Sequence, residues 1–338
     1  MGDPGIRVEG ISKVFGKTPA KALELVRSGM GKAELLEKTG HVLGLHDINL
    51  TIGAGEIFVI MGLSGSGKST LIRHFNRLIE PTAGRILVDG EDILRLDEPG
   101  LRNFRRRKIA MVFQRFGLLP HRNVLDNVMY GLLIDGVTRR KAEERAREQL
   151  ALVGLAGFET RFPAQLSGGM QQRVGLARAL ATDAGILLMD EAFSALDPLI
   201  RHDMQLQLKA LQAKLQKTII FITHDLDEAL LLGDHIAILK DGTVRQAGTG
   251  AEILTRPADD YVARFVHDVN RARILTCGQI TDRAIRVDTP GSVDARAPIE
   301  TAFAAFAQGE QAIAVVNGNG QPIGAITWQR VMQALAGR

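Results

Sequence analysis

The sequence predicts an α/β fold with a largely parallel sheet, and three observations lead to this prediction. A short apolar run at 57–61 has the length and β-branched content of a buried strand, and a glycine-rich loop and a helical pattern follow it. Two later apolar runs, 186–190 and 218–223, end in acidic or polar residues. Helical segments alternate with these runs to about residue 250, which is typical of a parallel sheet whose strand ends carry the functional groups.

Before the glycine-rich loop, the hydrophobic pattern changes period twice. Residues 6–15 alternate loosely between apolar and polar and predict a strand. Residues 19–39 follow a helical period that is broken by glycines at 29 and 31, which predicts two short helices. Alternation returns at 46–52 and predicts a strand that leads, through a Gly-Ala-Gly turn, into the strand before the loop.

After the loop, strands are predicted at 85–90 and 108–114, and a hairpin is predicted at 235–247. The stretch 124–156 is helical, with Arg and Glu on the face that must contact water, and it interrupts the alternation of strands and helices. We therefore expect a helical subdomain at about 120–182.

Two domains are expected, because 338 residues exceed the usual size of one. Residues 1–268 would form the α/β domain, and residues 269–295, which are poorly patterned, would form a linker. Residues 296–338 would form a small α+β unit. The expected elements of this unit are a helix, two strands and a last helix, with the first three at 299–307, 312–317 and 322–327.

Composition and charge narrow the range of functions. No apolar run approaches the ~20 residues of a membrane helix and no signal-peptide pattern is present at the start, so we expect any role at a membrane to involve a partner. The single cysteine, Cys277, excludes an internal disulfide and a cysteine-based zinc site and is typical of the cytosol. A basic cluster at 102–108 accounts for much of the net charge of +4. With few aromatic residues nearby, this cluster predicts a solvated face and no nucleic-acid partner.

The loop after the first buried strand has the G-x-x-x-x-G-K-[ST] spacing of a phosphate-binding loop. Its glycines let successive backbone N–H groups point at phosphate oxygens, and the following helix adds its positive N-terminal end. Lys68 is expected to reach the β- and γ-phosphates of ATP, and the Ser69 hydroxyl to bind Mg²⁺. The alternative, a glycine-rich turn with a chance lysine, is disfavoured by the flanking strand and helix. The loop residues predicted to bind ATP are Gly62, Ser64, Gly65, Ser66, Gly67, Lys68, Ser69 and Thr70.

Polar residues at the ends of three other predicted strands complete a candidate site for MgATP hydrolysis. Asp190 closes an apolar strand, where its carboxylate would hold Mg²⁺ through water. Glu191 follows directly and is the candidate for polarising the attacking water. His224 and Gln114 end two further apolar strands and are expected beside the loop, with Gln114 as another Mg²⁺ contact. The alternative for Asp190 and Glu191 is a strand that ends in two solvated acids.

A second glycine-rich helix start lies at 166–173, where the sequence reads LSGGMQQR. Ser167, Gly168 and Gly169 precede a predicted helix and form a further anion site. One chain cannot easily cradle one nucleotide with both sites, whereas a two-fold dimer lets each copy offer its second site to the γ-phosphate bound by the other. The sequence therefore suggests a homodimer.

These motifs, in this order, resemble those of ABC-type ATPases over residues 6–267. The resemblance identifies 166–173 as the signature motif, 194–197 as the D-loop, Gln114 as the Q-loop glutamine and His224 as the switch histidine. It implies a head-to-tail homodimer with two ATP molecules sandwiched between opposed loops. ATP would close this dimer and hydrolysis would open it, which drives a pair of integral-membrane permease subunits docked near the Q-loop.

Three further nucleotide contacts follow from this resemblance. Phe15 falls where these ATPases carry an aromatic residue that stacks on adenine, and a core position is the alternative for this side chain. Gln171 of the signature motif and Asp197 of the D-loop are the other two.

The regions 21–52 and 103–132 resemble the ATPases of osmoprotectant importers for glycine betaine, proline betaine, carnitine or choline, and 312–327 resembles one CBS repeat. This implies an ATP hydrolase that powers import of a quaternary ammonium compound from the cytoplasmic face of the inner membrane, as a peripheral subunit. A periplasmic or lipid-anchored substrate-binding protein would be an indirect partner. With one clear copy of a repeat that usually comes in pairs, we expect pairing between two subunits or loss of its regulatory role.

Two alternatives stay open at this point. An ABC importer ATPase for another small solute, such as an amino acid, would carry the same motifs, because the cargo does not touch this chain. A soluble, non-transport ABC ATPase that acts on ribosomes or DNA is the second alternative. Such ATPases usually carry two cassettes or a long coiled-coil insertion, and neither is present in this sequence.

Overall fold

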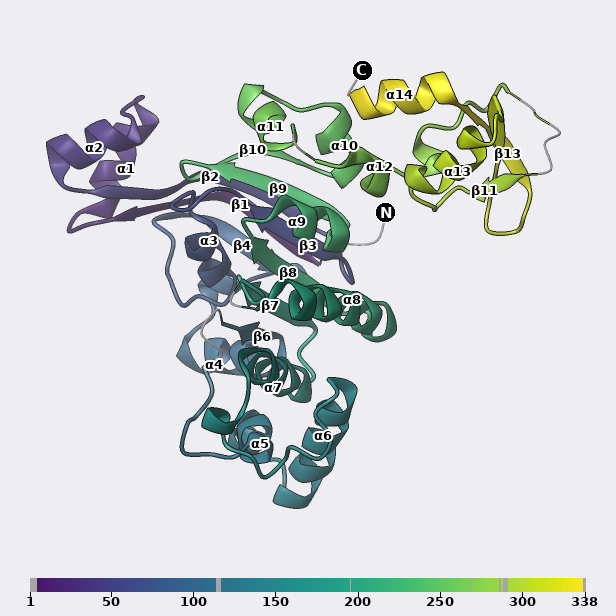
Figure 1. The fold of residues 1–338 in the computed structure, drawn as a ribbon. Helices are drawn as coiled ribbons and strands as arrows, with labels where there is room; N and C mark the ends of the chain where they lie inside the picture. Colours follow the sequence, from purple (N-terminus) through teal and green to yellow (C-terminus); the bar gives the residue numbers. More distant parts are fainter. Residues whose placement is uncertain are drawn as a thin grey trace. The chain divides into compact units, whose positions relative to one another are not determined.

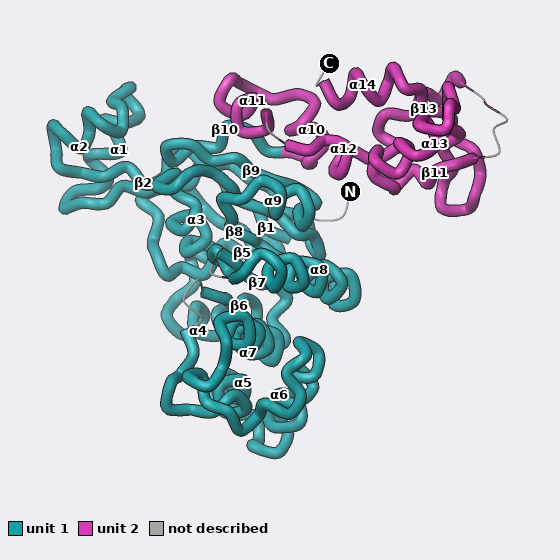
Figure 2. Tube along the Cα trace, viewed as in Figure 1, with its two compact units in different colours: residues 1–247 teal, residues 248–338 magenta. Residues whose placement is uncertain are grey.

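The computed structural model describes residues 5–113, 117–194, 196–267, 269–285, 287 and 291–336. The chain divides into two compact units, Met1–Ala247 and Gly248–Arg338, which Figure 2 colours separately. The first unit contains two sheets and the second contains one, and each unit has its own hydrophobic core. The sequence led us to expect the end of the first domain at residue 268. The division lies upstream of that residue, because the helices after Gly248 belong to the second unit.

A six-stranded sheet forms the centre of the first unit (Figure 1). Its strands are β3 (Ile57–Met61), β6 (Ile109–Val112), β7 (Ile186–Asp190), β8 (Thr218–Thr223), β9 (His235–Lys240) and β10 (Thr243–Gly248). Their spatial order is β10-β9-β3-β8-β7-β6. β3 pairs in parallel with β8 and β9, and β7 pairs in parallel with β8 and β6. The prediction of a largely parallel α/β sheet is therefore confirmed.

The central strands of this sheet are continuous apolar runs because neither face contacts water. Every residue of β3, β7 and β8 is buried, and a strand covered on both faces has no reason to alternate with polar residues. The register pairs Met61 with Thr223 and Asp190 with Ile222. The carboxyl ends of these three strands therefore meet at one edge of the sheet, as the sequence predicted.

A second, four-stranded sheet has the order β2-β1-β4-β5. Its strands are β1 (Ile6–Phe15), β2 (Val42–Ile52), β4 (Ala83–Val88) and β5 (Glu91–Asp92), and they pair antiparallel. Its apolar face, with Ile6, Ile48 and Ile52 fully buried, shares one core with Ile60 of β3 and Leu71 of the helix after the loop.

Two short helices, α1 (Pro19–Arg27) and α2 (Lys32–Thr39), lie between β1 and β2, as predicted. They lie at the extended ends of these strands in Figure 1. Leu23 and Leu35 pack there with Val14 and Leu43 in a small separate core. β2 begins at Val42 rather than at residue 46, because Val42 and Leu43 pair with the end of β1.

The remaining helices of the first unit cover the main sheet or extend beyond its β6 edge. They are α3 (Lys68–Phe75), α4 (Glu98–Arg107), α5 (Val124–Ile134), α6 (Arg139–Leu152), α7 (Gly168–Ala181), α8 (Pro198–Leu215) and α9 (Leu226–Leu232), with the short 3₁₀ helices η1 (Ile93–Arg95) and η2 (Pro163–Gln165). α7 packs against α5 and α6, and the three helices gather beyond β6 in Figure 1, in the region where the sequence predicted a helical subdomain. Among the described residues, no helix has both the length and the apolar character needed to span a membrane.

The second unit contains a three-stranded sheet with the order β11-β12-β13. Its elements are α10 (Gly250–Thr255), α11 (Asp260–Phe265), α12 (Arg271–Ile274), η3 (Cys277–Gln279), β11 (Ser292–Asp294), η4 (Ile299–Ala302), α13 (Phe303–Ala307), β12 (Ala312–Val316), β13 (Pro322–Thr327) and α14 (Trp328–Ala336). β12 and β13 pair antiparallel, and β11 joins β12 in parallel.

The structure differs from the expected linker at 269–295. Cys277 is fully buried in the core of the second unit, and its backbone N–H donates to the oxygen of Ala297 at 2.8 Å. β11 is part of the sheet. The elements in this stretch have only three or four residues each, so they are too short to show a helical or strand period in the sequence.

Candidate nucleotide-binding site

The glycine-rich loop joins the carboxyl end of β3 to the first residue of α3. Gly67 is the N-cap of α3 with a φ of +103°, and a Cβ at this position would lie 2.8 Å from the carbonyl oxygen of Gly44. At Gly62 a Cβ would overlap the carbonyl oxygen of Leu239. Both positions therefore require glycine. The hydroxyl of Ser66 is buried and has no hydrogen-bond partner among the described residues, so this loop contains an unpaired polar group that a phosphate oxygen would satisfy.

Lys68 lies inside this loop with 5% of its surface exposed. Its Nζ donates to the oxygens of Gly62 at 2.8 Å and Leu63 at 3.2 Å. Burial lowers the pKa of the ammonium group, and the nearby carboxylates of Glu191 and Asp190 oppose that shift. The Lys68 side chain is thus held within the phosphate-binding loop by the loop's own carbonyl groups.

Asp190, the last residue of β7, faces the start of α3. Its Oδ1 accepts a hydrogen bond from Ser69 Oγ at 3.0 Å, and its Oδ2 lies 3.7 Å from Nη2 of Arg73. Burial raises the pKa of this carboxyl, while the Ser69 bond and Arg73 oppose the shift. A hydroxyl and a carboxylate side by side are the hard oxygen ligands that Mg²⁺ prefers. Ser69 and Asp190 therefore fit a magnesium ion, and their role as its ligands stays a prediction.

Glu191 is brought next to Lys68 and His224. Its Oε1 lies 3.9 Å from Lys68 Nζ and 3.8 Å from His224 Nδ1. The backbone of Glu191 has a φ of +47°, which is unusual for a side chain with a Cβ, and its N–H donates to the oxygen of Ile222 on β8 at 3.2 Å. This conformation turns the chain at the end of β7 and places the carboxylate beside the loop.

A cleft of about 280 Å³ opens over the loop. Its lining comprises Phe15, Lys32, Val42, Leu43, Gly44, Ser64, Gly65, Gly67, Lys68, Ser69, Thr70 and Glu191. Phe15 is 39% exposed, and the Nζ of Lys13 lies 5.0 Å from its ring centroid. The ring therefore borders the cleft and is not a core residue, and its role in stacking on adenine stays a prediction.

Sequence reasoning missed Lys32. It is the first residue of α2, and its Nζ lies within 3.4 Å of the carbonyl oxygen of Gly65, to which it donates a hydrogen bond. Nothing in the spacing of the sequence indicates this, because the contact joins two segments that are far apart in the chain. A cation at the phosphate loop complements a polyphosphate.

The residues of the second anion site lie elsewhere in the unit. None of the nucleotide contacts predicted from the signature motif and the D-loop is among the described residues that line the cleft. These predicted contacts are Ser167, Gly168, Gly169, Gln171 and Asp197. Ser167 caps α7 by accepting from Met170 N, and Gln171 donates to the oxygens of Pro163 and Leu166. Within one chain the two glycine-rich helix starts therefore do not share a cleft. Gln114 lies outside the described residues.

Comparison with known proteins agrees with this geometry. The sequence pattern of the ABC transporter family matches residues 45–194. The glycine betaine transport ATP-binding protein OpuAA of Bacillus subtilis is 56% identical over 84% of this chain and 68% of its own length. The trimethylamine N-oxide transport system ATP-binding protein TmoW of Ruegeria pomeroyi is 47% identical over 99% of this chain and 98% of its own.

A solved structure shows the same fold. The dimeric structure of a post-hydrolysis state of the ATP-binding cassette MJ0796, bound to ADP and Pi, aligns with a TM-score of 0.62 and 33% identity over 72% of this chain and 98% of that chain. The phosphate loop, the carboxylates at the end of β7 and the identity to OpuAA all lead to one conclusion. The chain belongs to the family of ABC transporter ATP-binding proteins that includes the glycine betaine transport subunits.

Proposed function

We propose that this chain is the ATP-hydrolysing subunit of an ABC importer for a quaternary ammonium osmoprotectant, with glycine betaine, proline betaine, carnitine and choline as candidate cargoes. The assignment of ATP hydrolysis rests on the convergence of Lys68, Ser69 and Glu191 on one cleft, together with the hydrogen bond between Ser69 and Asp190. Identities of 52–56% to glycine betaine transport subunits support the cargo class.

Each side chain at this site would have its own role in ATP hydrolysis. Bound MgATP would supply the phosphoryl group and a cation that neutralises charge as the γ-phosphate is transferred. Ser69 and Asp190 would hold the Mg²⁺, with Asp190 acting through water, and Lys68 would bind the β- and γ-phosphates. Glu191 would accept a proton from the attacking water. His224, 3.8 Å from Glu191 Oε1, would orient that carboxylate.

A homodimer would complete each nucleotide site. The signature residues, among them Ser167, lie outside the cleft of their own chain, and Ser167 is exposed at the start of α7. In a two-fold dimer this helix start would contact the γ-phosphate held by the Lys68 of the other copy. The solved relative at 33% identity is itself a dimer, which supports this arrangement.

Replacing Ser167 with arginine is expected to reduce hydrolysis by about 100-fold or more, because removing transition-state donors costs this much. ATP binding to Lys68 in the same chain should be retained. Steady-state hydrolysis and binding of a fluorescent ATP analogue measure the two effects. Thr138→Arg, an arginine at the exposed N-cap of α6, is the matched control. Full hydrolysis by the Ser167→Arg variant would contradict the proposed dimer site.

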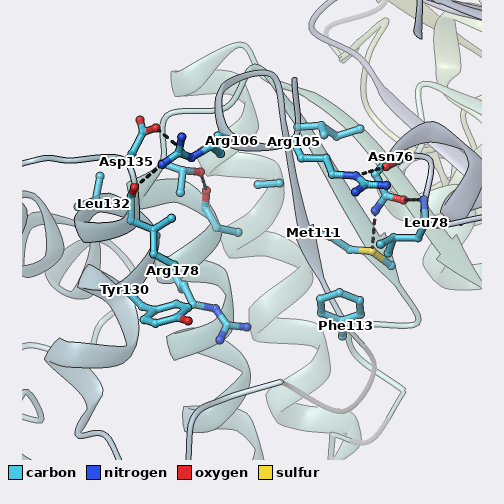
Figure 3. A pocket seen from close by; sticks show the side chains of 16 residues that line it. Asn76, Leu78, Arg105, Arg106, Met111, Phe113, Tyr130, Leu132, Asp135 and Arg178 are labelled. Carbon is cyan, nitrogen blue, oxygen red and sulfur yellow. Dashed lines mark hydrogen bonds and ion pairs between the residues drawn. The ribbon is translucent and has the colours of Figure 1, made fainter. Parts of the chain in front are cut away.

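The permease subunits would dock on an apolar pocket of about 370 Å³ between α4, β6, α5 and α7 (Figure 3). Phe113 and Ile134 in its lining are 39% and 51% exposed. Arg106 at the rim is paired with Asp135, with 3.4 Å between Nε and Oδ1. The pocket begins next to residue 114, where the resemblance places permease docking. This chain would then be a peripheral subunit on the cytoplasmic face of the inner membrane, with a periplasmic or lipid-anchored substrate-binding protein as the indirect partner.

Trimethylamine N-oxide is a second candidate cargo. The observation that supports it is the share of each relative's own length that this chain matches. TmoW of Ruegeria pomeroyi matches over 98% of its length, whereas OpuAA matches over 68% and ProV of Escherichia coli over 70%. Uptake of labelled glycine betaine and of labelled trimethylamine N-oxide into vesicles that contain the complete importer decides between them. ATP-dependent uptake of glycine betaine is expected. Uptake of neither methylated amine, with transport of an amino acid instead, would overturn the cargo assignment.

Replacing Lys32 with alanine is expected to raise the KM for ATP by about 1.5- to 5-fold, with little change in kcat, because an exposed ionic contact is worth about 0.2–1 kcal/mol. The physical reason is the loss of a cation at the phosphate loop. Steady-state hydrolysis against ATP concentration measures both constants. Lys21→Ala on α1 removes an exposed lysine outside the cleft and is the control. An unchanged KM in Lys32→Ala would show that this side chain does not contact the nucleotide.

A further inference from the structure

The second unit contains a pocket of about 750 Å³ that ATP hydrolysis does not use. It lies between α13, the end of β13 and the start of α14. Its lining comprises Phe303, Phe306, Ala307, Gly309, Glu310, Gln311, Thr327, Trp328 and Gln329. This volume is within the range of small-molecule sites.

Three aromatic rings dominate the pocket wall. The centroid of Trp328 lies 6.3 Å from that of Phe303 and 5.6 Å from that of Phe306, with angles of 74° and 58° between the ring planes. The rings are therefore steeply inclined to one another and do not stack face to face. Trp328 remains 49% exposed, which is a large exposed surface for the one tryptophan of the chain.

The charged residues around the pocket indicate which sign of charge a ligand should carry. Glu310 is the sole charged side chain among the described residues that line it. The nearby Arg330 is directed elsewhere, since its Nη1 lies 3.2 Å from Asp282 Oδ2 and its Nε donates to the oxygen of Ile280. A pocket with a carboxylate and no lining cation disfavours phosphate-bearing ligands and favours a cation.

We propose that this pocket binds a methylated ammonium cation of the choline type. Its methyl groups would contact the aromatic rings, its positive charge would lie over their faces, and Glu310 would supply the counter-charge. Choline is one of the candidate cargoes, so a regulatory meaning, in which imported choline is sensed by the ATPase subunit, rests on the proposed function. The binding itself does not depend on it.

The intrinsic fluorescence of Trp328 tests the proposal directly, because the chain has one tryptophan. Choline is titrated into the full chain without nucleotide or permease, and a saturable change in emission is expected. Phe306→Ala and Glu310→Gln should each weaken choline binding by about 3- to 30-fold. The neutral isostere 3,3-dimethylbutan-1-ol should bind more weakly than choline by a similar factor. Glycine betaine, whose carboxylate would face Glu310, should also bind more weakly.

Met332→Ala is the matched control, because Met332 is an exposed apolar residue of α14 that does not line the pocket. Its choline affinity should equal that of the unmodified chain.

The proposal is overturned if choline causes no saturable change in emission, or if the neutral isostere binds as well as choline. Light scattering tests whether a second copy of the chain covers this surface instead. If Phe306→Ala and Met332→Ala both disrupt a dimer and choline has no effect, the surface belongs to a contact between two copies and the proposal is overturned. Failed transport of betaines with intact choline binding would instead refute the proposed cargo.

Discussion

Replacing Glu191 with glutamine is expected to preserve ATP binding and to reduce kcat for hydrolysis by about 100- to 10,000-fold, the usual contribution of a general base. Glutamine has nearly the shape of glutamate but accepts no proton from water. Because Glu191 Oε1 lies 3.9 Å from Lys68 Nζ, the neutral amide should leave the lysine free to bind phosphate. The variant should therefore accumulate in the ATP-bound state.

Three measurements check this expectation. Steady-state hydrolysis gives kcat, binding of a fluorescent ATP analogue gives affinity, and light scattering with ATP gives the oligomeric state, in which a dimer should accumulate. Glu148→Gln makes the same chemical change on the exposed face of α6 and should leave all three unchanged. Hydrolysis at the unmodified rate would remove Glu191 from its role. A variant that binds ATP but stays monomeric would contradict the dimer.

Replacing Lys68 with alanine is expected to reduce ATP turnover by about 100- to 1,000-fold and to weaken ATP binding, because the γ-phosphate loses its main cation. The side chain is almost fully buried, and the oxygens of Gly62 and Leu63 accept from its Nζ. Removing it leaves these two carbonyl groups without their donor and the loop without its charge.

The fold of this variant must be checked separately, since the lysine also bonds to its own loop. Thermal unfolding with and without ATP serves this purpose, and ATP should raise the Tm of the unmodified chain but not that of Lys68→Ala. Lys209→Ala is the matched control, because Lys209 Nζ also donates to a carbonyl oxygen, that of Leu231, outside the cleft. A Lys68→Ala variant that hydrolyses ATP normally would contradict the assigned role.

Much of the first unit was predictable because its signals are local in the sequence. The run Ile57–Met61, the loop that follows it and the start of α3 are adjacent, so spacing alone identifies them. Parallel strands require helical crossovers between them, so the alternation of apolar runs and helices predicted the sheet. That sheet brings Asp190, Glu191 and His224 to the phosphate loop, as expected.

The second unit was less predictable because its elements are short and depend on distant partners. β11 has three residues and is a strand only through its pairing with β12. The preceding stretch lacks a clear period, so the sequence predicted a linker where the structure places Cys277 in a core. The predicted likeness of this unit to one CBS repeat stays a prediction.

The sequence by itself determined the phosphate-binding loop, the acids at the end of β7 and the parallel sheet, because these follow from short-range spacing and from the burial of continuous apolar strands. Only the tertiary structure decided that Lys32 reaches the loop and that Trp328 forms a pocket with two phenylalanines. The physical reason is the same in each case. These arrangements depend on which distant segments pack together, and a local pattern of residue types does not predict that packing.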